Sequence, residues 1–324
     1  MENSSGNIKL QYQKPWLMDR KYQEQVRLML RIAPEIAAIE EFALHGGTAI
    51  NLFHHNMPRL SVDIDLTYVP FDSREKDLSK ISELLQGLSE RLKRTIPGIH
   101  VRGNSVDGDE IKLFCQLNGV EVKIEVNTIN RGIMSDIEKH VLCEAAQDYF
   151  EMFVELILVP APQLFGGKMV AALDRQHPRD LFDTKKILDR NGLSDEIMQG
   201  FLFCLFSSKR PIIEILNPNL INNENVIVNQ FLGMTNENFS IETYNHEKER
   251  LINAIYKHLT TRQKNMILSV AKGDPEWIYA DWSRFPGIAW KLKNIEILKN
   301  SNPAKFKHQT EHLEVFLSGA ASEL

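Results

Sequence analysis

Two aspartates one residue apart, Asp63 and Asp65, are the residues of this chain best suited to do chemistry. On one face of a strand, two such carboxylates repel each other, and without compensation at least one would have a raised pKa and be neutral. A divalent cation removes this conflict, and hard oxygen ligands of this kind suit Mg²⁺ or Mn²⁺. The pair therefore predicts half of a metal site.

A third acid is expected from a second strand. The segments RLSVDIDLTYV (59–69) and VEVKIEVN (120–127) both alternate apolar and polar residues, which predicts strands with one polar face. In the first segment this face would carry Arg59, Ser61, Asp63 and Asp65. If the two strands pair, Glu125 of the second can converge with both aspartates on one or two metal ions. Asp109 and Glu110 are loop alternatives for the third acid.

A glycine pair, Gly46 and Gly47, comes before the aspartates and opens a segment that reads as a two-turn helix. A glycine turn at a helix start lets backbone N–H groups approach phosphate oxygens, and the helix N-terminus favours their charge. Thr48 could add a hydroxyl. Two metals bridged by carboxylates would bind a triphosphate, align its α-phosphorus with an attacking hydroxyl and stabilise the departing pyrophosphate. Glycines, short helix and acidic strand together predict nucleotidyl transfer.

A helical hairpin is expected around His177-Pro178, because Pro178 suits the first position of a helix. This turn could bring Lys168 of the first helix near Asp183 of the second. A lysine there would neutralise triphosphate charge as a mobile cation. Arg179 lies one turn before Asp183 on the same face, so it could pair with Asp183 or touch phosphate.

These motifs resemble those of the polymerase-β-like nucleotidyltransferases. More narrowly, they resemble the AbiEii/AbiGii toxin family, which belongs to toxin–antitoxin and phage-defence pairs and includes the mycobacterial MenT toxins. The family pattern is GG-T-A-L, then R-x-S-x-D-I-D-L, then a lysine and R-D-x-x-D. In this chain it falls on Gly46, Gly47, Thr48, Ala49 and Ile50, on Arg59, Ser61 and Asp63 to Leu66, and on Lys168, Arg179, Asp180 and Asp183. Ile50 replaces the usual leucine, and the second glycine stands where many nucleotidyltransferases have serine.

The resemblance implies a Mg²⁺-dependent (or Mn²⁺-dependent) toxin that transfers a nucleoside monophosphate from an NTP to a hydroxyl. It implies tRNA as the acceptor and a cognate antitoxin of winged-helix type. Within the motifs, Asp183 would be the acidic residue that works with Lys168.

Two other functions fit parts of the pattern. DIDLT also matches the Asp-x-Asp-x-Thr motif of haloacid-dehalogenase-type phosphatases, but their nucleophile lies on a strand buried on both faces, and this segment alternates. A nucleotide-binding interaction protein without turnover is the non-enzymatic alternative. Arg59 and Ser61 could likewise be phosphate ligands or only polar partners of Asp63, and His45 reads as a structural strand histidine.

The fold expected around these residues is α+β: a mixed or antiparallel sheet flanked by helices, followed by a mainly helical C-terminal region. Helices are predicted at 19–42, 48–55, 73–96, 162–176 and 178–190, and strands at 42–47, 59–69, 98–105, 111–118, 120–128, 138–146 and 153–160. We expect a nucleotidyltransferase core over residues 1–195, with the N-terminal helix and the hairpin. Residues 196–324 are expected to form a helical domain that binds the acceptor or a partner, interrupted by an Asn-rich loop at 216–230.

Composition limits the class of protein. The chain has 324 residues, of which 43% are hydrophobic and 25% charged, as in ordinary globular proteins. No apolar run approaches the roughly 20 residues of a transmembrane helix, and no secretory signal is visible, so a cytoplasmic protein without membrane contact is expected. Three widely spaced cysteines, Cys115, Cys143 and Cys204, suggest reduced core thiols.

The net charge of −5 argues against a generally basic nucleic-acid binder, but a local patch remains possible. Five lysines lie near the C-terminus, on what could be a solvated helix face and loop or an RNA contact: Lys291, Lys293, Lys299, Lys305 and Lys307. Trp282 and Trp290 could stack on a base or pack in the core.

Overall fold

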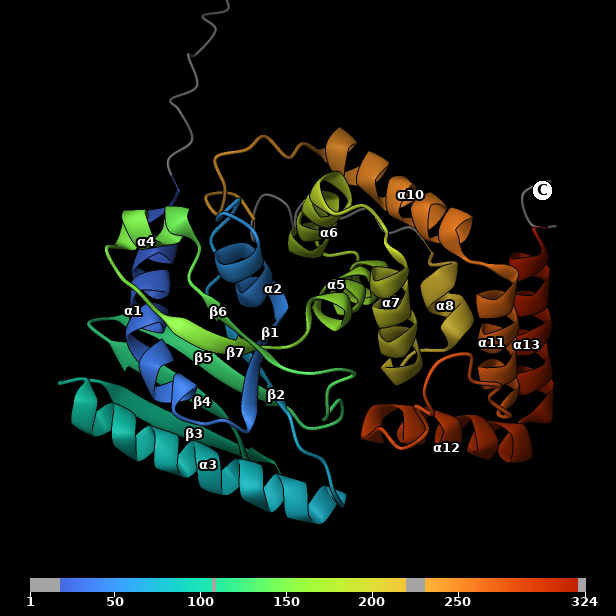
Figure 1. Cartoon of the computed structure of the whole chain (residues 1–324), viewed down its shortest axis with the longest axis horizontal. Coiled ribbons are helices and arrows are strands. Elements are labelled where there is room, and N and C mark those ends of the chain that lie inside the picture. The colour runs from blue at the N-terminus through green and yellow to red at the C-terminus, as the bar shows by residue number, and fades with distance from the viewer. Residues whose placement is uncertain (1–17, 107–108, 220–230, 320–324) are drawn as a thin grey trace, which may run out of the picture.

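A seven-stranded mixed sheet forms one half of the molecule, in the order β3-β4-β5-β2-β1-β7-β6 (Figure 1). The computed structural model describes residues 18–106, 109–219 and 231–319. The pairs β2–β5 and β1–β7 are parallel, and the other neighbours are antiparallel. The strands are β1 Phe42–His45, β2 Ile64–Tyr68, β3 His100–Val106, β4 Asp109–Leu117, β5 Val120–Asn127, β6 Glu138–Val141 and β7 Glu155–Leu158. The predicted α+β class is confirmed.

Helices surround the sheet and form the rest of the chain. In the sheet half they are α1 Arg20–Ala37, α2 Gly46–Ala49 with the π-helical turn η1 Ile50–His54, α3 Arg74–Thr95 and α4 Glu144–Phe150. The others are α5 Ala161–Arg175, α6 Pro178–Arg190, α7 Asp195–Ser207, α8 Ile212–Leu216, α10 Ile241–His258, α11 Thr261–Lys272, α12 Pro286–Ser301 and α13 Pro303–Ser318. Helix α1 packs on β5 and β7, and α3 packs on β4.

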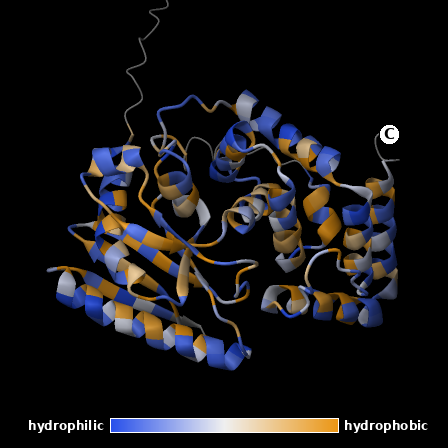
Figure 2. Ribbon diagram, in the orientation of Figure 1, coloured by the Kyte–Doolittle hydropathy of each residue, from blue (hydrophilic) through white to orange (hydrophobic). Residues whose placement is uncertain are grey.

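Alternation of apolar and polar residues explains the sheet, as Figure 2 shows along its strands. In β5 the side chains of Val122, Ile124 and Val126 are buried, as their spacing predicted. Four predicted strands are clearly shorter than expected. The strand predicted at 42–47 ends at His45, and the one at 153–160 spans only Glu155–Leu158. The segment 59–69 is a strand only from Ile64, and the segment 138–146 is a strand only to Val141, after which α4 begins.

The predicted hairpin is formed by α5 and α6, and His177 caps α6 by accepting a hydrogen bond from the Arg179 N–H. Helix α7, beyond residue 195, crosses α5 at two glycines. A Cβ on Gly166 would lie 2.1 Å from the Phe201 nitrogen, and one on Gly200 would lie 1.9 Å from the Pro162 carbonyl oxygen. Only glycine permits such contact between backbones. The first C-terminal helix is therefore packed directly on the hairpin that carries Lys168.

Two tryptophans of the C-terminal region, Trp282 and Trp290, differ in burial. Trp282 is buried in an aromatic cluster, with its ring centroid 5.4 Å from that of Phe203, so it belongs to the core. Trp290 on α12 is 52% exposed. The lysine-rich segment forms two helices, α12 and α13, in place of the expected helix and loop, and Lys291 is buried. Within the expected Asn-rich loop, residues 220–230 lie outside the described part of the chain.

Among the residues that the structure describes, no helix combines the length and the apolar character needed to cross a membrane. All three cysteines are free, and burial raises the pKa of the Cys115 and Cys204 thiols to about 12.

Candidate active site

The predicted pairing of the two acidic segments is confirmed. Strand β2 begins at Ile64, so Asp63 directly precedes it and Asp65 is its second residue. Asp65 lies opposite Glu125 in the parallel register of β2 with β5, and opposite His45 in the antiparallel register with β1. The strand ladder therefore holds the carboxylate-bearing residues side by side at one point of the sheet.

The carboxylates of Asp63 and Asp65 repel each other at this point of the sheet. Burial raises the pKa of Asp65, and the Asp63 carboxylate raises it further. Burial, reinforced by the Lys168 charge, lowers the pKa of His45 to about 4, so this imidazole is neutral at pH 7. His45 thus cannot supply the positive charge that Asp65 needs.

Glu125 differs because two lysines neutralise it. Its carboxylate oxygens lie 2.9 Å from the Lys112 Nζ and 2.8 Å from the Lys123 Nζ. Burial would raise its pKa, but the hydrogen bonds from Lys123 and then Lys112 lower it below the usual range. Glu125 is therefore ionised and already paired.

The described residues contain no group of three or more His, Cys, Asp or Glu side chains arranged to hold a metal ion. The chemistry of the donors nevertheless fits a hard cation at Asp63 and Asp65, because an added positive charge would relieve the repulsion that raises the pKa of Asp65. Each Glu125 oxygen already contacts a lysine, and its part in a metal site remains a prediction.

The glycine pair is shaped by the acidic strand and by the segment before it. Gly46 has φ +76°, and a Cβ there would lie 2.7 Å from the Asp65 Oδ2. A Cβ on Gly47 would lie 2.6 Å from the Arg59 Nη2 and 3.0 Å from the Ser61 Oγ. Both positions thus exclude a side chain, and the helix that they open continues into η1, a π-helical turn of a kind frequent at functional sites.

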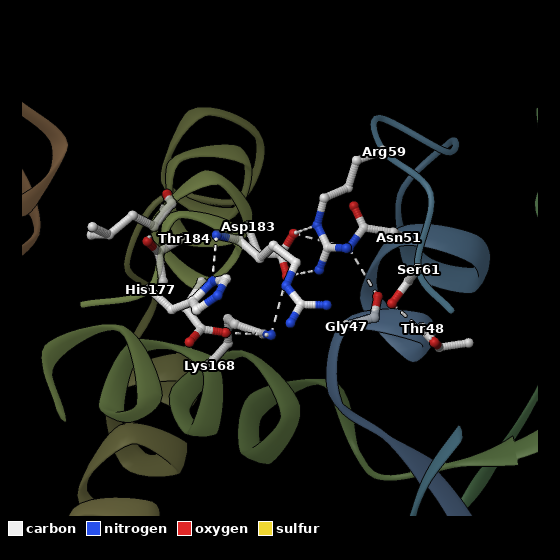
Figure 3. Close-up of polar contacts among 12 residues, drawn as sticks. Gly47, Thr48, Asn51, Arg59, Ser61, Lys168, His177, Asp183 and Thr184 are labelled. Carbon is white, nitrogen blue, oxygen red and sulfur yellow. Dashed lines mark hydrogen bonds and ion pairs between the residues drawn. The ribbon is translucent and has the colours of Figure 1, made fainter. Parts of the chain in front are cut away.

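The expected strand face of four polar residues is wrong at its beginning. Arg59 and Ser61 precede β2 and are buried, and Arg59 forms a two-pronged ion pair with Asp183 (Figure 3). Its Nε and Nη2 lie 2.7 and 2.6 Å from the two carboxylate oxygens. The Thr48 hydroxyl donates to the Asp63 carbonyl oxygen at 2.5 Å and is also hydrogen-bonded to the Ser61 hydroxyl at 3.0 Å. These side chains brace the glycine turn from inside the protein.

Lys168 and Asp183 come together as the hairpin predicted. The Lys168 Nζ lies 3.1 Å from Asp183 Oδ2 and 3.1 Å from Asp180 Oδ1. Burial would raise the pKa of Asp183, but Arg59 and then Lys168 lower it to about 2. Asp183 is fully buried and acts on the site through the two cations that it holds.

Two members of this network were not assigned a role from the sequence. Asp180 bridges Lys168 and Arg175, and the Asn51 amide donates to both the Gly47 carbonyl and Asp183 Oδ1 at 2.9 Å. Asp180 could have been found from its place in the R-D-x-x-D segment. Asn51, four residues after Gly47, offered only helical spacing.

Arg179 does not make its suggested pair with Asp183, whose carboxylate is held by Arg59, Lys168 and Asn51. Its Nη1 instead lies 3.8 Å from Asp63 Oδ2. Asp63 is therefore partly compensated by Arg179, whereas the Lys123 and Lys168 charges lower the pKa of Asp65 by less than burial and the Asp63 carboxylate raise it. The alternatives for the third acid, Asp109 and Glu110, begin β4, and their side chains lie outside the described part of the structure.

A cavity of about 620 Å³ opens between the sheet and helices α5 and α7. Its walls include the glycine pair, Asp65, Glu125 and Lys168, and it is large enough for a nucleotide. The end of α7 and the loop after it supply Phe203, Cys204, Ser207, Ser208 and Lys209. That contribution was not predicted, because nothing in residues 196–210 resembles a known motif.

A mixed sheet with a glycine turn, paired acids and a lysine around one nucleotide-sized cavity defines the class of nucleotidyltransferases. The family described as "Nucleotidyl transferase AbiEii toxin, Type IV TA system" matches residues 27–288, and the chain belongs to this family. The structure is similar to that of MenT4, a nucleotidyltransferase toxin from Mycobacterium tuberculosis H37Rv. The two share 11% sequence identity with a TM-score of 0.60, over 85% of this chain and 93% of that chain, which is a likeness of fold.

No curated protein matches the chain in sequence. The family nevertheless identifies the chain as an AbiEii-type nucleotidyltransferase toxin, an enzyme that uses an NTP and is paired with an antitoxin. This decides against the phosphatase and the purely non-catalytic alternatives.

Proposed function

We propose that the chain transfers a nucleoside monophosphate from an NTP to a hydroxyl of an RNA acceptor, with tRNA as the acceptor implied by the family, and releases pyrophosphate. Asp63 and Asp65 would hold Mg²⁺ or Mn²⁺, with Glu125 as a third ligand. The toxin would act in the cytoplasm, and a winged-helix antitoxin would restrain it.

One observation carries this proposal. Asp65 has a raised pKa and faces a nucleotide-sized cavity that Gly46, Gly47 and Lys168 also line. Asp65 is partly buried next to Asp63 and forms no ion pair among the described residues, which is the arrangement expected where a triphosphate and its metal bind.

When bound, a divalent cation would neutralise triphosphate charge and favour ionisation of the attacking hydroxyl. The protein itself shapes the space in which the triphosphate would lie. The backbone at Gly46 and Gly47 leaves room for phosphate oxygens beside the Asp65 carboxylate, because neither residue has a side chain. Helices α5 and α7 form one wall of the cavity.

Lys168 lines the cavity from α5, as does Arg175 at the end of the same helix. Its side chain is 8% exposed, and Asp180 and Asp183 hold its amine from behind at 3.1 Å. We assign Lys168 to the phosphates, and Asp183 to positioning Lys168 and Arg59. Arg179 is assigned to the phosphates through its place beside Asp63.

The test is a transfer assay with each radiolabelled NTP, total tRNA and Mg²⁺ or Mn²⁺. Wild-type protein should label RNA with at least one NTP, and Asp63→Ala and Asp65→Ala should each abolish labelling and relieve toxicity in cells. Glu121→Gln is the matched control, because Glu121 lies on β5 four residues before Glu125 and pairs with Arg102 outside the cavity lining. Absence of RNA labelling, together with toxicity that survives both aspartate substitutions, would refute the proposal.

A further inference from the structure

Helix α12 starts at the wall of the active-site cavity. A Cβ on Gly287 would lie 2.3 Å from Asn130 Oδ1 and 3.2 Å from the Ser207 Cβ, and both neighbours line the cavity. In Figure 1 the helix runs from there toward α11 and α13. Its first turn is thus packed against two residues of the cavity wall.

A buried lysine secures the next turn. The side chain of Lys291 is buried, and its Nζ donates to the Arg210 carbonyl and, at 3.2 Å, to the Ser208 Oγ. Ser208 and its neighbour Lys209 line the cavity, and Lys209 is exposed. Lys291 therefore joins α12 to the cavity rim and is not available to a ligand.

The opposite face of α12 is exposed and has an unusual composition. Trp290 and Ile297 are each 52% exposed, and Lys293 between them is also exposed. Their spacing of three and four residues places them in one stripe along the helix, which we call the α12 stripe. Tryptophan is highly buried on average in folded proteins, so an exposed one in line with an exposed isoleucine is a candidate contact surface. The exposed charges of the helix are Lys293 and Lys299 against one acid, Glu296.

An exposed aromatic side chain beside lysines is the combination that binds single-stranded nucleic acid, because the ring stacks on a base and the amine meets the phosphate backbone. Trp290 is three residues from Gly287, a rise of about 5 Å along the helix axis. An RNA strand stacked on Trp290 could therefore place its next nucleotides at the cavity. Charge also favours this ligand over a basic peptide.

We propose that the α12 stripe binds the single-stranded part of the acceptor RNA next to the reacting hydroxyl, with a base stacked on Trp290 and a phosphate near Lys293. This inference rests on the proposed function for the identity of the acceptor. It adds the surface that holds the acceptor outside the cavity.

The first experiment measures binding without turnover, by fluorescence anisotropy of a labelled, mixed-sequence single-stranded RNA with a free 3′ hydroxyl. Trp290→Ala should weaken binding about tenfold, as loss of one stacked base does, while Trp290→Phe should retain most of it. Lys293→Glu should weaken binding and reduce its salt dependence. Phe153→Ala is the control, because Phe153 is a 68% exposed aromatic residue in the sheet half.

The second experiment repeats the transfer assay with these variants. Trp290→Ala should raise the KM for RNA and leave the KM for the NTP unchanged. RNA binding that is unaffected in Trp290→Ala, or loss of antitoxin binding alone, would overturn the inference while leaving the proposed transfer reaction intact. Conversely, failure of wild-type transfer would not affect the binding measurement, so the two proposals fail separately.

Discussion

Replacing Asp183 by asparagine removes the negative charge that holds Arg59 and Lys168 together. The Arg59 and Asp183 side chains are 3% and 0% exposed, so water cannot take over the role of the lost carboxylate. The asparagine has nearly the same volume. The substitution therefore tests the charge and the hydrogen bonds with little change in packing.

The magnitude follows from the geometry. Burial would raise the pKa of Asp183, but Arg59 and Lys168 lower it from 3.8 to about 2. At ~1.4 kcal/mol per pKa unit, this shift alone corresponds to about 2 kcal/mol of stability at neutral pH. Breaking a buried pair on one side typically costs about 3–5 kcal/mol, because the partner charge stays buried. We expect Asp183→Asn to lower the free energy of unfolding by about 3 kcal/mol.

Urea denaturation at several pH values is the assay. A lowered pKa in the folded state means that the stabilisation is complete above the unfolded value of 3.8 and is lost as the pH falls toward about 2. The difference between wild type and Asp183→Asn should therefore be constant near pH 7 and shrink over that acidic range. Double-mutant analysis with Arg59→Met should show a coupling between the two positions.

Asp189→Asn on the same helix is the control. Asp189 pairs with Lys185 and Arg250 but is 35% exposed, so its loss should cost less than about 1 kcal/mol. An Asp183→Asn variant no less stable than Asp189→Asn would refute the reasoning, because the buried network would then contribute nothing beyond a surface ion pair.

Two glycine substitutions test the close contacts around the cavity. Gly46→Ala should cut transfer about a hundredfold by displacing Asp65. Gly119→Ala, with a similar φ of +81° but open space around its Cβ, should cost about 1 kcal/mol in urea denaturation and keep activity. Gly200→Ala should destabilise by about 3 kcal/mol or more as α7 is pushed from α5. Gly87→Ala in α3 should instead stabilise the protein by about 0.5 kcal/mol or more, because a Cβ on Gly87 would have its nearest neighbour at 3.7 Å. If Gly46→Ala and Gly119→Ala had equal effects, or Gly200→Ala and Gly87→Ala did, the close contacts described at Gly46 and Gly200 would be contradicted.

Much of the fold follows from local patterns. The alternation in 120–127 predicted β5, and the apolar periodicity of 73–96 predicted α3 almost to its ends. Pro178 predicted the start of α6. Such features depend on backbone geometry and on residues within a few positions, so the sequence is sufficient for them. The alternation pattern wrongly predicted that Arg59 and Ser61 lie on the polar face of the strand. Both are buried before the strand begins, and the ion pair with Asp183 allows the charged Arg59 side chain to be buried.

The sequence predicted which residues form the candidate site, but it predicted few of the contacts between them. Lys168 and Asp183 meet because the hairpin between them is short. The partner of Arg59 lies 124 residues away and could not be read from spacing. The lysines on Glu125 and the pairing of Arg179 with Asp63 likewise depend on how strands and helices pack.

The sequence by itself determined the chemistry: two aspartates one residue apart, a glycine pair before them and a lysine on a helical hairpin indicate nucleotidyl transfer, because those groups suit a metal and a triphosphate. Only the tertiary structure decided how each group is used. It buried Asp183 away from the cavity lining, made α7 a cavity wall and left Trp290 exposed on α12. Burial and ion-pair geometry arise from packing between distant segments, which no local pattern of residues specifies.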